Sequence, residues 1–346
     1  MKKLLLVIFV LILVAGAYLG WIFLGPATGF KENEKFLYIK TDSANKTAVM
    51  KTIKEGNYIH NVKGFQWLAN QMKYWNKIKP GKYKIEKGES MLAIIRRLRN
   101  GQQTPVNLVI TRVRTKENFA RLVANKFEFD STAMMHFLNN PDSLNNYGVK
   151  PETAMTVVLP NTYTYYWNTT PSKVYQKLYD ESQKFWNDDR KEKATQKGLT
   201  AQTAYILASI IEEETNAKTD KPNIASVYLN RIKIGMPLQA DPTVKFALKD
   251  FGIKRILHKH LEVESPYNTY RNQGLPPGPV TTPSLETINA VLDSPPTEYI
   301  YFVANSDFSG THIFTTNYND HLKYAREYQQ ALNRQDSARK AKQAAN

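Results

Sequence analysis

The chain has 346 residues, a formal net charge of +16 and no cysteine. This length is enough for two domains with real cores. The lack of cysteine excludes disulfides, thiol nucleophiles, thiolate metal sites and a lipidated N-terminal cysteine. A surface this basic suggests an anionic partner: nucleic acid, a membrane surface or an acidic polymer. The alternative is a charge that only keeps the protein soluble.

The first predicted element is a membrane anchor. Residues 4–24 form an uncharged, apolar run of 21 residues, which as a helix crosses a hydrocarbon core about 30 Å thick. Lys2 and Lys3 precede it, so the positive-inside rule leaves the N-terminus in the cytoplasm and the rest of the chain outside. A cleaved signal peptide is the competing interpretation, because residues 15–17 resemble a cleavage site. The apolar run continues past them, which favours an uncleaved anchor (1–24). This location argues against nucleic acid as a partner and leaves membrane headgroups and cell-wall polymers.

A membrane-proximal domain is predicted over 25–149. Its clearest unit lies at about 80–101, where an alternating strand leads through Ser90, a candidate N-cap, into an amphipathic helix that stops at Gly101. This strand–turn–helix resembles half of a LysM module, a sugar-binding repeat of cell-wall proteins. A plain α/β packing unit is the alternative. Around this unit we predict strands at 36–40 and 106–110 and helices at 46–54, 64–72, 115–126 and 131–139.

A segment rich in Asn, Asp, Pro and Gly, Pro141–Lys150, is predicted to be a boundary loop. The second domain, 150–325, then carries helices at about 171–189 and from Ala201 onward, and late strands at 299–304 and 312–316. A polar tail follows (326–346), expected as a solvated helix from Lys323 that frays into disorder. The fold class is therefore α+β: an N-terminal transmembrane helix, a small LysM-like α/β domain and a mixed helical and β domain.

Carboxylates carry the chemistry that the sequence suggests. The six histidines form no HExxH pair, and the chain has no Gly-rich phosphate loop and no GxSxG elbow, so no metal or cofactor is expected. An apolar helical run, 204–211, is followed at once by Glu212, Glu213 and Glu214. Burial raises the pKa of a carboxyl group, and a protonated Glu can act as the acid in glycosidic-bond cleavage. We therefore expect the apolar helix to keep Glu212 protonated for catalysis.

The alternative for these three residues is a solvated, acidic helix end. Glu214 has Lys218 at i+4, the spacing of an exposed ion pair. In the same way, the Asp-Pro sequence at Asp241 is a common helix start, with Asp as the N-cap. Its functional alternative is that Gln239, Asp241 and Thr243 line a cleft. The Pro- and Tyr-rich segment 265–279 is either a stiff surface loop or a set of partners for sugar rings and N-acetyl groups.

Several motifs, in order, resemble those of the endolytic murein transglycosylases, the YceG-like family. The first is LASIIEEET at 207–215. The others lie at 225–231, 235–244, 265–270, 274–279, 301–304 and 312–314. The likeness is strong over 150–325 and looser over the anchor and the LysM-like unit.

The resemblance implies a lyase that cleaves the β-1,4 bond from N-acetylmuramic acid to N-acetylglucosamine in nascent glycan strands. The muramic acid 6-hydroxyl closes on its own anomeric carbon and leaves a 1,6-anhydro end. Because the nucleophile belongs to the substrate, one carboxylate suffices where the usual glycosidase needs two. The family motif puts that general acid/base on Glu212. No cofactor is implied, and the implied partners are glycan strands, the cytoplasmic membrane, peptidoglycan synthases and the elongation machinery.

The resemblance also implies substrate contacts, with Asp241 capping a helix at the cleft wall and Glu214 in a supporting role. The residues expected to bind the glycan are Glu214, Gln239, Asp241, Thr243, Tyr267, Asn268, Tyr270, Leu275, Pro276 and Tyr163. One position departs from the family, which often has an acidic residue where this chain has Asn161. Two other functions stay open: a hydrolase using Glu212, Asp241 and water, and a non-catalytic cell-wall tether.

Overall fold

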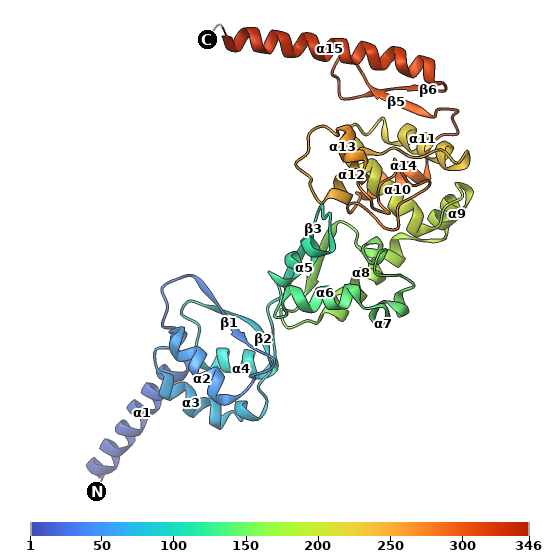
Figure 1. The fold of residues 1–346 in the computed structure, drawn as a ribbon. Helices are drawn as coiled ribbons and strands as arrows, with labels where there is room; N and C mark the ends of the chain where they lie inside the picture. The colour runs from blue at the N-terminus through green and yellow to red at the C-terminus, as the bar shows by residue number, and fades with distance from the viewer. Residues whose placement is uncertain (1, 345–346) are drawn as a thin grey trace. The chain divides into compact units, whose positions relative to one another are not determined.

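The structure is a computed structural model that describes residues 2–344. Its chain forms two compact units, each built from several stretches of sequence (Figure 1). Unit 1 comprises Met1–Leu108, Leu122–Asp130 and Tyr163–Thr170, and unit 2 comprises Val109–Arg121, Ser131–Thr162 and Pro171–Asn346.

Helix α1 (Lys2–Leu24) opens unit 1. Within the described part of the chain it is the one helix long and apolar enough to cross a membrane. Its side chains from Leu4 to Val14 are exposed instead of packed on the protein. Burying that surface in lipid would remove it from water, so the helix agrees with the predicted anchor.

The rest of unit 1 packs two strands and three helices around one apolar core. Strands β1 (Glu34–Ile39) and β2 (Gly81–Glu86) pair antiparallel, with Leu37 opposite Tyr83 and both side chains buried. Helices α2 (Lys46–Glu55), α3 (Val62–Gln71) and α4 (Met91–Asn100), with a 3₁₀ turn η1 (Tyr74–Asn76), complete it.

The strand–turn–helix predicted at 80–101 is confirmed. Ser90 Oγ accepts the N–H of Ala93 at 3.3 Å and caps α4. Gly101 ends the helix at φ 70°, a left-handed conformation that glycine adopts without a Cβ penalty. The likeness to a LysM module, and sugar binding by this unit, remain predictions.

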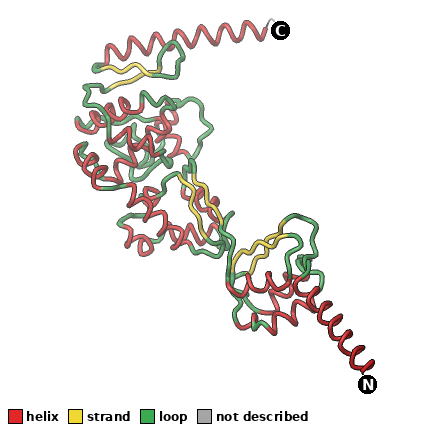
Figure 2. Tube along the Cα trace, turned by 180° about the vertical axis from the view of Figure 1, so that it is seen from behind, coloured by secondary structure: helices red, strands yellow, loops and turns green. Residues whose placement is uncertain are grey.

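The middle of the chain contains short elements that differ in part from expectation. Strands β3 (Val106–Ile110) and β4 (Asn161–Tyr165) form one of the two-stranded sheets within residues 2–344, whose strands are drawn yellow in Figure 2. The predicted loop 141–150 contains helix α7 (Pro141–Leu144), because Asn140 Oδ1 caps it at 2.9 Å with Pro141 next, and two 3₁₀ turns, η2 (Asn145–Tyr147) and η3 (Ala154–Val157), follow.

The single helix predicted at 171–189 is two helices, α8 (Pro171–Phe185) and α9 (Asp188–Gln196). Asn187 separates them, since its side chain accepts the N–H of Arg190 and starts a new helix. The preceding helices are α5 (Lys116–Ala124) and α6 (Ser131–Asn139).

Helix α10 (Ala201–Glu214) lies at the centre of the main core of unit 2. Every side chain from Ala204 to Ile211 is buried, which explains its apolar sequence. The helices that contribute to this core or flank it are α9, α11 (Lys221–Lys233), α12 (Asp241–Leu248), α13 (His258–Leu261) and α14 (Leu285–Leu292) (Figure 1).

Unit 2 ends in a β-hairpin and a long helix. Strands β5 (Tyr301–Ala304) and β6 (His312–Thr315) pair antiparallel, with Ala304 opposite His312. Helix α15 (Tyr318–Ala344) packs on this hairpin. The polar helix predicted for the tail is thus confirmed and is continuous to Ala344, while residues 345–346 lie outside the described residues.

Candidate active site

The last turn of α10 presents three consecutive carboxylates to three different environments. The helix starts with a capping box in which Thr200 and Thr203 bond each other's backbone. Near its other end, Ser209 Oγ accepts the N–H of Val280 at 3.0 Å. Both contacts fix the register of the helix, and so the direction of each Glu.

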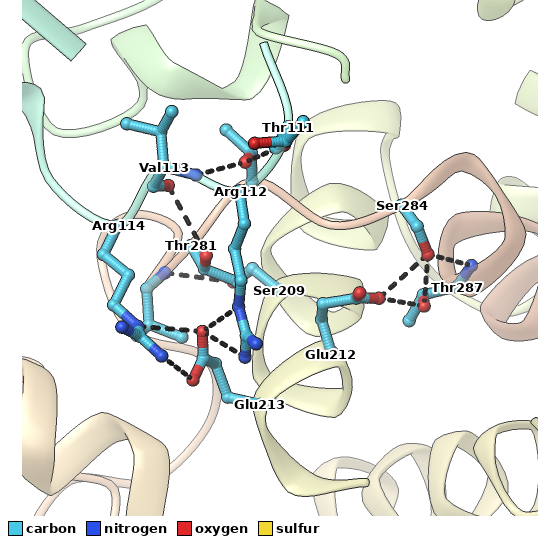
Figure 3. Close-up of polar contacts among 12 residues, drawn as sticks. Thr111, Arg112, Val113, Arg114, Ser209, Glu212, Glu213, Thr281, Ser284 and Thr287 are labelled. Carbon is cyan, nitrogen blue, oxygen red and sulfur yellow. Dashed lines mark hydrogen bonds and ion pairs between the residues drawn. The ribbon is translucent and has the colours of Figure 1, made fainter. Parts of the chain in front are cut away.

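Glu212 is hydrogen-bonded to residues of two neighbouring helices, and Figure 3 shows its contacts with Ser284 and Thr287. Its Oε2 accepts hydrogen bonds from Lys221 Nζ at 3.0 Å, from Ser284 Oγ at 2.9 Å and from Thr287 Oγ1. Lys221 begins α11, while Ser284 caps α14 and Thr287 lies in its first turn. Lys221 is itself buried and also donates to Thr287 at 2.6 Å.

These contacts overturn the expectation that Glu212 is kept protonated. Burial alone raises the pKa of Glu212, but the hydrogen bonds from Thr287 and Lys221 more than offset it, so the pKa lies below its ordinary value. The reason is that the apolar helix ends against a lysine and two hydroxyl groups that come from elsewhere in the chain.

Glu213 is held by two arginines. Arg112 and Arg114 donate to its carboxylate oxygens at 2.6–3.1 Å (Figure 3). The segment that carries them is fixed in turn, because the Val113 N–H donates to Thr282 Oγ1 at 2.9 Å. Glu213 therefore joins α10 to the chain between β3 and α5.

The surroundings of Glu214 raise its pKa, whereas those of Glu212 lower it. Its Oε1 accepts a hydrogen bond from the buried Tyr228 hydroxyl at 2.6 Å. Burial raises the pKa of Glu214 to about 7, the Tyr228 hydrogen bond partly offsets this, and the charge of Asp241 adds to it. The exposed pair predicted with Lys218 is wrong, because Lys218 pairs with Glu286 at 2.8 Å.

A cavity of about 500 Å³ opens beside Glu214. One wall is formed by Glu214, the last residue of α10, and by the three residues that follow it, up to Ala217. The other walls come from the β5–β6 hairpin, with Phe308 and His312, and from Tyr328 of α15. This volume is in the range of small-ligand pockets, which bury their ligand between apolar walls and a few polar groups.

Asp241 does not cap α12 as expected. It is the first residue of the helix, the N-cap position is Ala240, and no side chain caps the helix. The Asp241 carboxylate instead accepts the Tyr270 hydroxyl at 2.7 Å. The Asp241 carboxylate therefore lies near Glu214 and does not cap the backbone N–H groups of α12.

Several residues expected to contact the glycan hold the loop together instead. Asn268 is fully buried and donates to the carbonyls of Leu261 and Val263 at 2.8 and 2.9 Å. Thr243 is buried and donates to the Ala240 carbonyl at 2.7 Å. The Gln239 N–H donates to the Thr269 carbonyl at 3.0 Å, at a backbone φ of 52°.

The remaining predicted contacts separate into different places. Leu275 packs on the main core of unit 2, and Pro276 is buried. Tyr267 packs on Phe246 and lines a second cavity of about 270 Å³. Tyr163 is 2% exposed and belongs to unit 1, so its ring has no free face for a sugar.

Sequence reasoning missed the residues that shape the cavity around Glu214. Tyr228 lies within the family motif at 225–231, and the sequence does not show that its hydroxyl meets Glu214. Phe308 stands in the hairpin loop at a φ of 58°, a conformation that is rare for bulky residues and marks a constrained position. Tyr328 comes from the polar tail. Pairing these segments requires the fold, so no local signal reveals them.

No group of three or more acidic, histidine or cysteine side chains that could hold a metal ion occurs among residues 2–344.

Comparison with known proteins gives one consistent family. Residues 37–327 match the profile of the YceG-like family. An endolytic murein transglycosylase of Bacillus subtilis (strain 168) is 29% identical over 339 residues, covering 92% of this chain and 91% of that protein. One from Streptococcus pneumoniae serotype 2 (strain D39) is 33% identical over 136 residues, which are 38% of this chain and 24% of that protein. The crystal structure of a YceG-like protein from Listeria monocytogenes superposes with a TM-score of 0.55 at 24% identity, covering 85% of this chain and 99% of that one.

Proposed function

This chain belongs to the YceG-like family, and from that premise we propose how it acts. It is a lytic transglycosylase, a lyase of peptidoglycan, like the relative that matches it over nine-tenths of both chains. In our proposal α1 anchors it in the cytoplasmic membrane, with both units on the outer side. The enzyme cuts the bond from N-acetylmuramic acid to N-acetylglucosamine in nascent strands and leaves 1,6-anhydro ends.

The observation that carries this proposal is the state of Glu214. A general acid/base works best when its pKa lies near the working pH, and the pKa of Glu214 is raised to about 7. The carboxyl group borders the cavity beside α10. We therefore assign the acid/base to Glu214 in place of Glu212, whose contacts with Lys221, Ser284 and Thr287 already occupy one oxygen and favour its charged form.

The reaction then follows from the substrate's own nucleophile. Glu214 donates its proton to the glycosidic oxygen that leaves the anomeric carbon. The muramic acid 6-hydroxyl closes on that carbon, and in the scheme with one carboxylate its proton passes to the Glu214 carboxylate, so no water is consumed. The walls of the cavity, with Phe308 and Tyr328 in contact at a ring-centroid distance of 5.9 Å, offer apolar ring surface for the sugar. Burial raises the pKa of the acid, the Tyr228 hydroxyl partly offsets the rise, and the Asp241 charge adds to it.

The test is product analysis. Uncrosslinked glycan strands are incubated with the full chain in detergent, and the new ends are identified by mass spectrometry. We expect 1,6-anhydro ends from the wild type and none from Glu214→Gln. Reducing ends would show a hydrolase, and the absence of cleavage would show a tether; either result overturns the proposal. Glu212→Gln is the matched variant, and full loss there with activity kept in Glu214→Gln would reverse the assignment.

Peptidoglycan synthases and the elongation machinery remain proposed partners of the anchored enzyme. The basic charge of the chain suits an anionic environment at the membrane and in the wall. Co-purification from crosslinked membranes, compared between the full chain and a chain without α1, tests whether anchoring brings these partners together.

A further inference from the structure

Asp220 and His312 form a pair at the wall of the Glu214 cavity. Asp220 comes directly before α11, and His312 opens β6. One carboxylate oxygen of Asp220, Oδ2, accepts two hydrogen bonds from His312, from the backbone N–H at 2.7 Å and from ring atom Nδ1 at 2.9 Å. The two side chains are 9% and 15% exposed, so the pair is mostly shielded from water.

This contact fixes which ring nitrogen carries the hydrogen. A carboxylate has no proton to donate, so Nδ1 must be the donor, and in the neutral ring Nε2 is then an acceptor. The other Asp220 oxygen accepts from Thr219 Oγ1 at 3.3 Å. Nε2 of His312 has no hydrogen-bond partner within the described chain, residues 2–344. His312 lines the same cavity as Glu214.

The pair does more than tie the hairpin to α11. The backbone hydrogen bond from His312 already makes that connection. The ring is held in addition, by the Nδ1 contact and by Phe302, whose ring meets it edge-on at 5.4 Å between centroids. Fixing an imidazole by a carboxylate at Nδ1 is how enzymes orient a histidine whose other nitrogen transfers protons.

We propose that His312 is a second catalytic residue, the base that takes the proton of the muramic acid 6-hydroxyl. This inference rests on the transglycosylase function proposed above. As the O6–C1 bond forms, the O6 proton passes to Nε2. The C1–O4 bond breaks with its electron pair on O4, which takes the proton of Glu214. The step ends with an anionic Glu214 and a cationic His312, and water in the emptied cavity returns the proton to Glu214.

With two catalytic groups, Glu214 no longer has to donate one proton and accept another in the same reaction. With one carboxylate alone, the same group must first give a proton to O4 and then receive one from O6. With His312 lining the same cavity, each group acts once and the two transfers occur together. Asp220 is a positioning residue in this scheme, since it acts through the orientation of the ring.

His312→Asn is the decisive variant. The Asn side-chain amide reaches the place of Nδ1 and can still donate to Asp220, but it has no base in the place of Nε2. On the strands used above, we expect kcat to fall by about 100-fold or more, with KM and thermal unfolding close to wild type. A merely structural role predicts the reverse, because Asn keeps the tether. A kcat within threefold of wild type overturns the proposal.

Controls separate the possible failures. His321→Asn changes a histidine that stacks on Tyr301 and does not line the cavity, and it should keep kcat. If His312→Asn does not fold, His312→Gln is measured in the same way; if neither folds, the pair is a tether and the proposal is wrong. Wild-type protein that gives no anhydro ends refutes the proposed function itself, whereas anhydro ends from an equally fast His312→Asn refute this inference alone.

Discussion

Glu212 and Glu214 lie two residues apart in the last turn of α10, on different faces of the helix, and their carboxyl groups have different pKa values. Glu212 points toward α11 and α14, where a buried lysine and two hydroxyl groups lower its pKa. Glu214 points toward Tyr228 and the cavity, where burial raises its pKa to about 7. Residues two apart on a helix do not share a face, so the same helix end supplies a charged structural anchor and an acid that holds its proton near neutral pH.

The largest expected effect is on catalysis. Glu214→Gln removes the proton donor at nearly constant shape, and we expect kcat on glycan strands to fall by roughly 10²–10⁴-fold. Glu212→Gln should keep kcat per folded molecule, although it should be less stable. Equal losses of kcat in two folded variants would erase the distinction between the two faces. Release of anhydro ends over time is the measurement.

The next effect is on stability and concerns the Glu212 face. Lys221→Met leaves the Glu212 charge mostly buried without its cation, and we expect a loss of about 3–5 kcal/mol in the free energy of unfolding. Lys218→Met is the control, because Lys218 and its partner Glu286 are both largely exposed and such pairs contribute about 0–1 kcal/mol. Urea unfolding measures both. Similar losses in the two variants would contradict the assignment of Glu212 as an anchor.

A third effect is the pH dependence that Glu214 brings. Because its pKa is raised in the folded state, from 4.5 to about 7, its favourable contribution is complete below about pH 4.5 and is lost as the pH rises to about 7. The loss is at most about 3 kcal/mol. Glu214→Gln cannot ionise, so the stability of wild type relative to this variant should fall over that range. Parallel stability curves would mean that Glu214 titrates normally.

The smallest expected effect is a change in the pKa of Glu214 when its hydrogen bond from Tyr228 is removed. The Tyr228 hydroxyl favours the charged form of Glu214, so Tyr228→Phe should raise the pKa of Glu214 further. A hydrogen bond to a charged group contributes about 1.5–3 kcal/mol, which corresponds to a rise in the pKa of about one to two pH units. The difference in unfolding free energy between Tyr228→Phe and the double variant with Glu214→Gln is measured against pH. The pH at which this difference changes gives the pKa of Glu214 without Tyr228. A shift to lower pH would reverse the assigned role of Tyr228.

The local parts of this fold could be predicted from the sequence because their signals are local. The Ser90 cap, the Gly101 stop and the apolar run that becomes α10 each act within a few residues of the element that they define. The family motifs are also short stretches of sequence, so the resemblance to the family could be recognised without the structure. Two predictions were wrong in part, the loop at 141–150 and the single helix at 171–189. In both places an Asn side chain, Asn140 or Asn187, caps a helix that begins inside a polar segment.

The electrostatics of the three glutamates could not be predicted, because their partners are distant in sequence. The Arg112 and Arg114 side chains meet Glu213 across about a hundred residues. Glu212 depends on Thr287 of α14, and the cavity at Glu214 depends on the hairpin and on α15. Desolvation was the right principle, but it prevails at Glu214 and is offset at Glu212 by hydrogen bonds. Only the fold decides which carboxylate meets a cation and which meets an apolar wall.

The C-terminal hairpin has one more consequence, for the order in which the enzyme is made. Chains emerge from the ribosome N-terminus first and fold in part as they do so. A nascent chain that ends before residue 301 already contains Glu214 and Tyr228 but lacks the cavity wall of Phe308, His312 and Tyr328. The cavity beside Glu214 therefore stays incomplete until Tyr328 has been made, and under our proposal the nascent enzyme cannot cut the wall before that point.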